Sequence, residues 1–448
     1  EVYALPVPLK YYLLGAGLAV AFSFFILAIF LNKNRSKGAD KVISLPWVPK
    51  VIVFTKFLST TLFLLTVFSG ILGIQDSTKN FAAIFFWIYF LLGMGILSLF
   101  VGNIWDKVNP WKIITDFVNH ENKTPTRQIS GVVGVVLLLG LFWWELVSGV
   151  SFVPRVIGMA LAVYTLVNLV LASVYKNWYE KGEVFSVLFG FIGKLAHFRI
   201  DEDNRSFVVW SESRKLDGNP APLWMLGVAA VLLAGASFDS LKESVMWFDW
   251  VRALGLVNEP TLAETIGVIL APVFFLLSYL LAVWIVKTLV GKNYQTFTLA
   301  RQFVFSLIPI AFGYTLAHNF SLFVVTSPRM LAVISDPFGF GWNLFGTALT
   351  LQQDLILGAK TVWFIEIAFI VLAHIAGVIY AHILALNIFK DSKLVLKSQY
   401  PLALLMVSYT VLTLWLLSQP LVVSKAEAQV QTDWLQTLRP PPVPLSPK

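Results

Sequence analysis

Residues 361–389, TVWFIEIAFIVLAHIAGVIYAHILALNIF, are the apolar stretch that decides the fold. A membrane-spanning helix needs about 20 mostly apolar residues, and this stretch is long enough to cross a bilayer. It also carries Glu366, His374 and His382. An ionisable side chain costs roughly 2.5 kcal/mol or more at the centre of a bilayer by insertion scales, so these residues are candidates for a functional role by default.

The rest of the chain has the same apolar character. Hydrophobic residues make up 57% of the 448 and charged residues only 13%, and the mean hydropathy is +0.76. A soluble domain of this size needs far more charge to cover its surface. The composition therefore predicts an all-α, polytopic transmembrane helical bundle that lies in a lipid bilayer.

Ten stretches of the sequence are predicted to be membrane spans. They are residues 11–31, 51–73, 81–105, 131–150, 156–174, 222–237, 264–289, 302–325, 361–388 and 401–422. Residues 184–198, VFSVLFGFIGKLAHF, are also apolar but too short to cross comfortably, so we expect a re-entrant or interfacial helix there, followed by a polar loop over 199–221. Residues 1–425 then form one transmembrane domain, and residues 426–448 form a proline-rich tail outside the membrane.

The distribution of positive charge predicts the orientation in the membrane. The connections after the first, third, fifth, seventh and ninth spans hold 22 of the 33 Lys and Arg, counting Lys287 at the end of the seventh span. Because cytoplasmic loops carry an excess of Lys and Arg, these connections are predicted to be cytoplasmic and both termini periplasmic or extracellular. This pattern is expected of a bacterial inner-membrane protein. It explains the net charge of +8 without a nucleic-acid partner.

Two of the predicted outer loops are long enough to fold over the membrane surface. They are residues 238–263 and residues 326–360, the second with the turn-rich run SDPFGFGW at 335–342. Aromatic-rich loops with Gly and Pro turns suit a lid over a site that faces the lipid. Packing against the helices, or against a partner subunit, would explain the same composition.

Ionisable residues in the spans predict a polar cluster in the outer half of the membrane. At 1.5 Å of rise per residue, His318 lies ~10 Å, Glu366 ~6 Å, His374 ~18 Å and His382 ~30 Å from the outer surface. Steps of eight residues turn the helix by only ~80° but separate residues by ~12 Å, so the three ionisable residues of the ninth span cannot all bind one ion. We therefore expect His318, Glu366 and His374 to cluster, with Glu145 near them and His382 apart.

Histidine and carboxylate side chains suit a divalent metal such as zinc or copper. His318, His374 and Glu366 are the predicted metal ligands, and Glu145 or Asp336 is the predicted additional ligand or catalytic base. The chain has no cysteine, which excludes disulfides, iron–sulfur clusters, thiolate metal sites and covalently attached haem. The alternatives are a haem b held by His318 and His374, or histidines that merely hydrogen-bond neighbouring helices.

Several motifs resemble bacterial membrane proteins described as fenitrothion hydrolase-like. They are VYALPVPLKYYLLGAGLAVAFSF at 2–24, GNIWDKVNPWK at 102–112, AHNFSLFV at 317–324, SDPFGFGWNLFGTA at 335–348, AHIAGVIYAH at 373–382 and SQYPLALLMVSYTVLTLWLLS at 398–418. The resemblance covers nearly the whole chain. It implies hydrolysis of organophosphate triesters by a membrane-bound enzyme, and it brings no assignment of catalytic residues.

Two functional hypotheses follow. The first is a metal-dependent hydrolase that opens to the outer face, where a bound divalent ion would lower the pKa of its water toward ~7. The second is a non-catalytic or electron-transfer subunit of a membrane complex, which would bind haem b or copper or act as a scaffold. A transporter would usually show repeated halves and broken helices. Pro272 and Pro309 interrupt two spans, but the sequence has no visible repeat.

Overall fold

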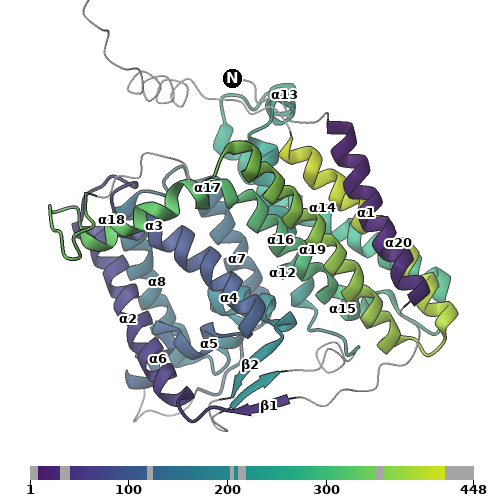
Figure 1. Cartoon of the computed structure of the whole chain (residues 1–448), viewed down its shortest axis with the longest axis horizontal. Coiled ribbons are helices and arrows are strands. Elements are labelled where there is room, and N and C mark those ends of the chain that lie inside the picture. Colours follow the sequence, from purple (N-terminus) through teal and green to yellow (C-terminus); the bar gives the residue numbers. More distant parts are fainter. Residues whose placement is uncertain are drawn as a thin grey trace, which may run out of the picture.

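The computed structural model describes residues 9–30, 41–118, 125–201, 206–209, 218–349 and 357–418. These residues form a bundle of helices with one small sheet at its edge (Figure 1). The predicted all-α polytopic bundle is thus confirmed. The predicted tail at 426–448 and the end of the last predicted span lie outside the described residues.

Every predicted span coincides with a helix or a continuous run of helices. The long elements are α1 (Leu9–Phe30), α2 (Val48–Leu72), α3 (Phe81–Ile84) continued by the π-helix η1 (Phe85–Leu92) and α4 (Gly93–Val101), α7 (Gly131–Leu146), α8 (Pro154–Val174), α12 (Trp224–Lys242), α14 (Pro260–Val290), α15 (Thr296–Phe303) continued by the 3₁₀ turn η3 (Val304–Leu307) and α16 (Ile308–His318), α19 (Ala359–Ile388) and α20 (Ser392–Leu417). Among the described residues, eight of these are long and apolar enough to cross a membrane.

Helix α7, which covers Gly131–Leu146, is a predicted span that falls short of that length. Helix α7 has 16 residues and reaches only ~24 Å, against a hydrocarbon core of about 30 Å. Its C-terminal end, which carries Glu145, therefore lies at the depth of the neighbouring polar side chains described below.

The helices form two groups that lie side by side in Figure 1. Helices α2, α3, α4, α7 and α8 make one group, and α12, α14, α16, α19 and α20 make the other. The N-terminal helix α1 packs on α19 and α20, so it joins the second group, and α7 packs on α12 between the groups. The sequence order alone would not place α1 beside the last two helices.

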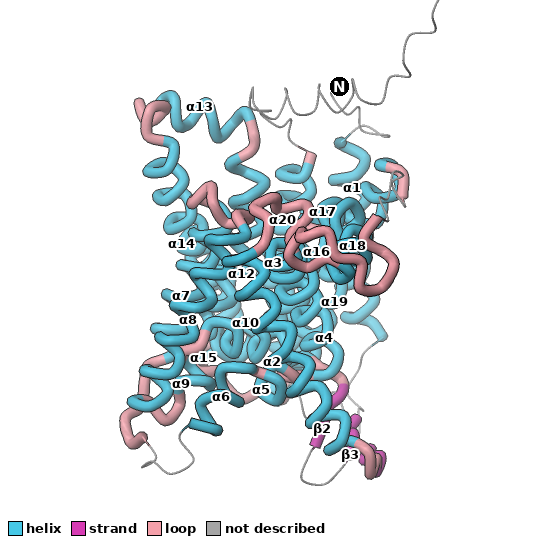
Figure 2. The backbone as a smooth tube through the Cα atoms, turned by 90° about the vertical axis from the view of Figure 1, so that its left-hand side faces the viewer, coloured by secondary structure: helices cyan, strands magenta, loops and turns pink. Residues whose placement is uncertain are grey.

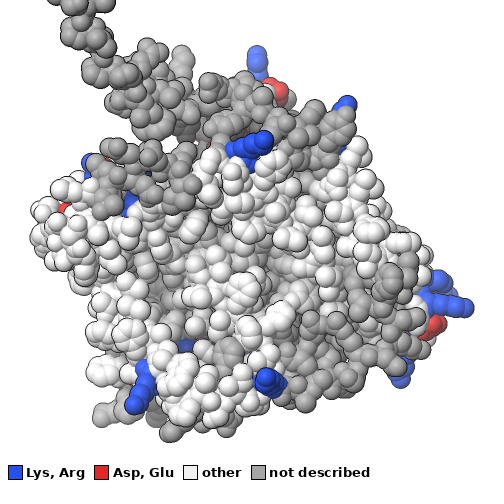
Figure 3. Space-filling view, viewed as in Figure 1, with Lys and Arg blue, Asp and Glu red and all other residues white. Residues whose placement is uncertain are grey.

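Short elements cover the two ends of the bundle, and Figure 2 shows them clearly. One end, the sheet face, carries α5 (Trp105–Val108), α6 (Pro110–Val118), α9 (Trp178–Lys181) and the sheet. The other end, the α13 face, carries α13 (Val245–Ala253), α17 (Phe320–Thr326), the 3₁₀ turn η4 (Ser327–Arg329) and α18 (Met330–Ser335). Figure 3 shows the described charged side chains near the rim, with an uncharged surface between them. That band suits the hydrocarbon core of a bilayer.

The sheet corrects the predicted polar loop at 199–221. Strands β2 (Phe198–Asp201) and β3 (Ser206–Val209) pair antiparallel, and β1 (Lys41–Ser44) pairs antiparallel with the other edge of β3. Val209 lies opposite Lys41 on one side and Phe198 on the other. Each strand has only four residues, too few to show a period, and their Val, Ile and Phe form strands once partners from distant loops are at hand.

The aromatic loop at 336–349 packs on the helices rather than covering the polar cavity described below. The carbonyl oxygen of Phe338 accepts a hydrogen bond from the N–H of Ile74 at 2.8 Å, in the connection between α2 and α3. Asp336 accepts from the N–H groups of Phe340 (2.9 Å) and Gly341 (2.7 Å). Both oxygens of this predicted base are thus used to hold its own turn. Residues 350–356 of the predicted loop lie outside the described residues.

Helix α10 (Val184–Ile192) and the 3₁₀ turn η2 (Gly193–Leu195) form the short apolar segment that was predicted not to cross the membrane. Together they span ~18 Å, and their neighbours along the chain, α9 and β2, both lie at the sheet face (Figure 2). The structure agrees with the predicted re-entrant course. The segment is buried in protein, where it packs on α4, α7, α12 and α16.

A buried carboxylate fixes the start of α10. Glu183 is fully buried and caps the helix by accepting from the N–H groups of Phe185 (3.0 Å) and Ser186 (2.7 Å). It also accepts from the indole of Trp105 at 3.1 Å and the amide of Asn109 at 3.2 Å. The hydroxyls of Tyr164 and Ser186 donate to it at 3.0 and 2.6 Å. This one side chain therefore joins α10 to α5, α6 and α8.

Candidate functional site

A polar cavity lies inside the bundle, toward its α13 face. Its volume is about 90 Å³, and its polar lining comes from the ends of α7, α12 and α16. The polar residues that line it are Glu145, Asp239, Thr315, His318 and Asn319. Apolar side chains from the π-helix and α10, among them Trp87 and Leu188, complete the walls. π-helical turns inside α-helices are often found at functional sites.

His318 and Asp239 form an ion pair at this cavity. The Nε2 atom of His318 lies 2.6 Å from an oxygen of Asp239, and their side chains are only 18% and 21% exposed. The second oxygen of Asp239 lies 3.1 Å from the Nζ atom of Lys242 one helical turn later. Lys242 also donates to the carbonyl oxygen of Leu146 at 2.7 Å, which attaches the end of α7 to α12.

The other ring nitrogen of His318 enters a hydroxyl chain that has two proton arrangements. Its Nδ1 atom lies 3.2 Å from the hydroxyl of Ser240, which lies 2.9 Å from the hydroxyl of Tyr314 and 3.1 Å from the carbonyl oxygen of Ala236. A neutral imidazole accepts the Ser240 proton, whereas an imidazolium donates to Ser240, whose proton then goes to Ala236. Both arrangements satisfy every group, and they differ by one proton.

Glu145 brings a second carboxylate to the same cavity. It is half-buried and lies close enough to Asp239, His318 and Lys242 to interact electrostatically with them. Glu264 on α14 interacts with Asp239 and Lys242 from the other side. Acidic groups thus outnumber basic ones here, which favours an added proton or cation.

The predicted metal ligands have different hydrogen-bond partners, although Glu366 lies close enough to His318 to interact electrostatically with it. Glu366 accepts a hydrogen bond from the hydroxyl of Ser321 at 2.7 Å. His374 is fully buried, and its Nδ1 lies 2.7 Å from the carbonyl oxygen of Ile370 in the preceding turn of α19. Its Nε2 has no hydrogen-bond partner among the described residues. His382 is buried as well, eight residues further along α19.

A zinc, copper or haem centre stays a prediction. Zinc takes about four ligands at about 2 Å, and in the described part of the chain no group of three or more His, Asp or Glu is placed to hold a metal ion. Both nitrogens of His318 are already hydrogen-bonded, which leaves none free for an axial bond to haem iron. When Nδ1 of His374 donates to the carbonyl oxygen of Ile370, Nε2 is the ring nitrogen that remains as an acceptor.

The sequence analysis missed the partners of His318. Asp239, Ser240 and Lys242 sit at the end of the sixth predicted span, where polar residues are ordinary and attract no attention. The one indication in the sequence is that Asp239 and Lys242 lie in the last turns of a helix whose preceding turns carry no charge. Only the packing of α12 on α16 identifies the pair.

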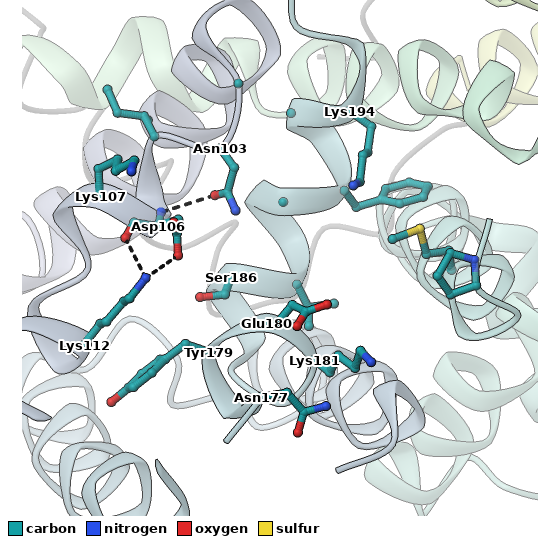
Figure 4. Close-up of a pocket in the computed structure, with 18 of the residues that line it drawn as sticks. Asn103, Asp106, Lys107, Lys112, Asn177, Tyr179, Glu180, Lys181, Ser186 and Lys194 are labelled. Carbon is teal, nitrogen blue, oxygen red and sulfur yellow. Dashed lines mark hydrogen bonds and ion pairs between the residues drawn. The ribbon is translucent and has the colours of Figure 1, made fainter. Parts of the chain in front are cut away.

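A second and much larger cavity lies on the sheet face (Figure 4). It has a volume of about 1600 Å³ and is lined by α5, α6, α9, α10, β2 and the loop before α12. Its charged lining, among the described residues, consists of Lys107, Lys112, Lys176, Lys181, Lys194 and Arg199 against Asp106, Asp116 and Glu180. This cavity is basic, whereas the cavity near the α13 face is acidic.

Helix α10 is a wall of both cavities. Leu188 and Ile192 line the cavity near the α13 face, and Val187, Gly190 and Phe191 line the cavity on the sheet face. At 100° per residue the two sets lie on roughly opposite sides of α10. The barrier between the cavities is therefore about one helix thick, ~10 Å.

Comparisons of the chain with family models, with curated proteins and with solved structures find no match.

Proposed function

We propose that this chain is a membrane transport protein whose site at His318 and Asp239 binds and releases a proton during transport. The observation that carries the proposal is the position of α10 between two cavities that lie toward opposite ends of the bundle. If a single helix closes the path of a solute, a movement of that helix alone can open the path to one side or the other. Backbone at membrane depth that is not part of a full span is tolerated where it lines a cavity.

The broken helices support the proposal. The run from α15 to α17 is interrupted by the 3₁₀ turn η3 and again at Asn319, beside His318. Transporters often place their binding sites at such discontinuous helices near the middle of the membrane. Intramembrane ionisable residues that face a cavity also mark ion and proton pathways.

The volume of the cavity near the α13 face favours a proton or a small ion over an organic substrate. Pockets for drug-sized ligands usually enclose about 300–1000 Å³, whereas this one encloses about 90 Å³. One water needs about 10–15 Å³ on this scale, so several waters fit. Water beside Glu145 and the pair of His318 and Asp239 would connect these groups to the α13 face.

Cysteine accessibility tests this proposal, because the chain has no cysteine of its own. Leu188→Cys and Val187→Cys place a thiol on each wall of α10, and both positions are buried. The two variants would be treated with a membrane-impermeant maleimide in vesicles of either orientation, at about pH 5 and about pH 8, where histidine changes charge. We expect each thiol to react from both sides, in proportions that depend on pH.

Exposed positions supply the controls. Thr78→Cys on the α13 face and Asn293→Cys on the sheet face report the sidedness of the vesicles and the intrinsic effect of pH on the reagent. If Leu188→Cys reacts only from the α13 face and Val187→Cys only from the sheet face at every pH, α10 does not move as transport requires and the proposal is wrong.

A hydrolase is the second candidate, and the pairing of His318 with Asp239 beside Glu145 is the observation that favours it. A carboxylate and an imidazole facing water are the groups that general acid–base catalysis uses. The resemblance to fenitrothion hydrolase-like proteins names phosphotriesters as the substrate class. The cavity would have to enlarge several-fold to admit such a molecule.

The test of this candidate is direct. Purified protein would be incubated with fenitrothion, with and without added zinc or copper, and the released nitrophenol followed by absorbance. Glu145→Gln and His318→Gln should abolish release, whereas Glu366→Gln should not. If the wild type releases no more nitrophenol than Glu145→Gln under all these conditions, this site does not hydrolyse the ester.

A further inference from the structure

We infer that the basic cavity on the sheet face is a binding site for a multiply charged anion that bears phosphate or carboxylate groups. The inference goes beyond the proposed function, because such an anion can bind there whether or not it crosses the membrane. It rests on the unpaired lysines, the amide donor and the size of this cavity.

Three lysines at the cavity lack an acidic partner. Lys176, Lys181 and Lys194 line it, and within the described part of the chain none of them makes an ion pair or side-chain hydrogen bond. Lys112 differs, because its Nζ lies 2.7 Å from the carboxylate of Asp106. Figure 4 shows this contrast, with Lys112 tied to Asp106 and both Lys181 and Lys194 free of such contacts.

The orientation of the protein in the membrane does not by itself explain where these three lysines lie. An excess of Lys and Arg in cytoplasmic loops sets topology wherever those residues lie along the loops. Lys292 and Lys390 follow α14 and α19 and do not line the cavity. Lys176, Lys181 and Lys194 come from three different segments yet line the same hollow. Like charges gathered around a concave surface focus the field and favour an oppositely charged ligand.

Asn103 adds a neutral donor to the same lining. Its side-chain oxygen accepts from the N–H of Asp106 at 3.3 Å, which directs the amide nitrogen to the other side. That nitrogen has no acceptor among the described residues, and a side chain at Gly190 of α10 would approach it to 3.3 Å. Asn103 belongs to the GNIWDKVNPWK motif, so this stretch forms one wall of the cavity.

The size of the cavity suits a phosphate-bearing group larger than an inorganic ion. At about 1600 Å³ it exceeds the usual range of small-molecule pockets, about 300–1000 Å³. Two sources offer the same chemistry, namely a soluble phosphate compound and the headgroup of an anionic lipid. Lysine recognises either one as a point charge.

The experiment compares two double variants of the full chain in nanodiscs. Lys181→Gln with Lys194→Gln removes two cavity charges, and Lys292→Gln with Lys390→Gln removes two charges from elsewhere on the sheet face. Pyrophosphate is the soluble probe, titrated by calorimetry in nanodiscs of neutral phosphatidylcholine at low salt. We expect the cavity variant to bind roughly tenfold more weakly or worse, as the loss of two charged contacts implies, and the control to bind like the wild type.

A second arm identifies the source. Nanodiscs that contain phosphatidylglycerol would be analysed by native mass spectrometry for lipid retained by each variant. Retention that falls only in the cavity variant, without pyrophosphate binding, assigns the site to a lipid headgroup. If both variants match the wild type for pyrophosphate and for lipid, the inference is overturned. Neither readout uses a gradient or a conformational change, so failure here is distinct from failure of the transport proposal.

Discussion

At the scale of single residues, burial and partner count separate structural side chains from those that change state. Glu183 is saturated by donors from three helices and from Asn109 between α5 and α6, so its charge is held in one place. His318 instead has partners that accept either of its protonation states. Both residues are buried ionisable groups, but only the second has an arrangement that can alternate. A buried polar group whose hydrogen bonds are all made is held rigidly. A group that can exchange its hydrogen-bond partners is the better candidate for a functional role.

Replacing Glu183 by Ala should destabilise the protein by about 3 kcal/mol or more, because several buried donors would lose their acceptor. The loss would be measured as thermal unfolding in detergent. Glu180→Ala removes an exposed carboxylate from the same short connection and should leave the stability nearly unchanged. Equal stability of the two variants would show that the donors around residue 183 find other partners.

Replacing His318 by Gln should abolish the pH dependence of maleimide reaction at Leu188→Cys. The amide can still reach Asp239 or Ser240, but it cannot gain a proton between about pH 5 and about pH 8. His374→Gln is the matched control, because among the described residues that histidine bonds only the Ile370 carbonyl within its own helix. A pH dependence that survives in His318→Gln and disappears in His374→Gln would move the proton site to α19.

At the scale of elements, α10 depends on close packing against the turn that opens the GNIWDKVNPWK motif. A side chain at Gly193 would meet the backbone nitrogen of Asn103 at 2.8 Å and the carbonyl carbon of Gly102 at 2.9 Å. Backbone atoms cannot swing aside as a flexible side chain can. The position of the end of α10, and with it the shared wall of both cavities, is therefore set by this contact.

Gly193→Ala should destabilise the protein by about 1–3 kcal/mol, as overpacking usually does. It should also weaken binding of pyrophosphate, because Asn103 must move away from the cavity. Gly93→Ala is the control, since a side chain there meets nothing within 4 Å and the substitution disturbs no contact. Thermal unfolding and calorimetry of the two variants check both parts, and unchanged stability in Gly193→Ala would mean that the loop yields freely.

At the scale of the whole molecule, the two ends differ in charge and in construction. The sheet face carries the basic cavity, and the α13 face carries short helices above the acidic one. A polarised molecule of this kind has a defined orientation in a membrane. The charge distribution predicts that the sheet face is cytoplasmic.

The same orientation predicts that both chain termini are on the outer side. A periplasmic reporter fused after Lys448 should be active, and Asn293→Cys should be protected from an impermeant maleimide in intact cells while Thr78→Cys reacts. An inactive fusion together with a reactive Asn293→Cys would mean that the sheet face is outside.

The sequence by itself determined the long helices and their approximate positions along the chain. Length and apolar composition suffice for a span, because a buried backbone in lipid must satisfy its own hydrogen bonds. The short segment at 184–198 was identified for the same reason, as it is too short to cross. Three four-residue strands escaped detection because each is too short to show a period, and because β1 comes from a loop far from β2 and β3 in the chain.

Only the tertiary structure decided which polar groups meet. The sequence predicts that His318, His374 and Glu366 lie in the same half of the membrane, but depth fixes one coordinate of three. The rotation and packing of α12 and α16 turn His318 toward Asp239, whereas His374 is fully buried against the Ile370 carbonyl of its own helix. The two cavities on either side of α10 are equally invisible in the sequence, because Val187 and Leu188 are adjacent apolar residues, about 100° apart on the helix, that line different cavities only once the helix is in place.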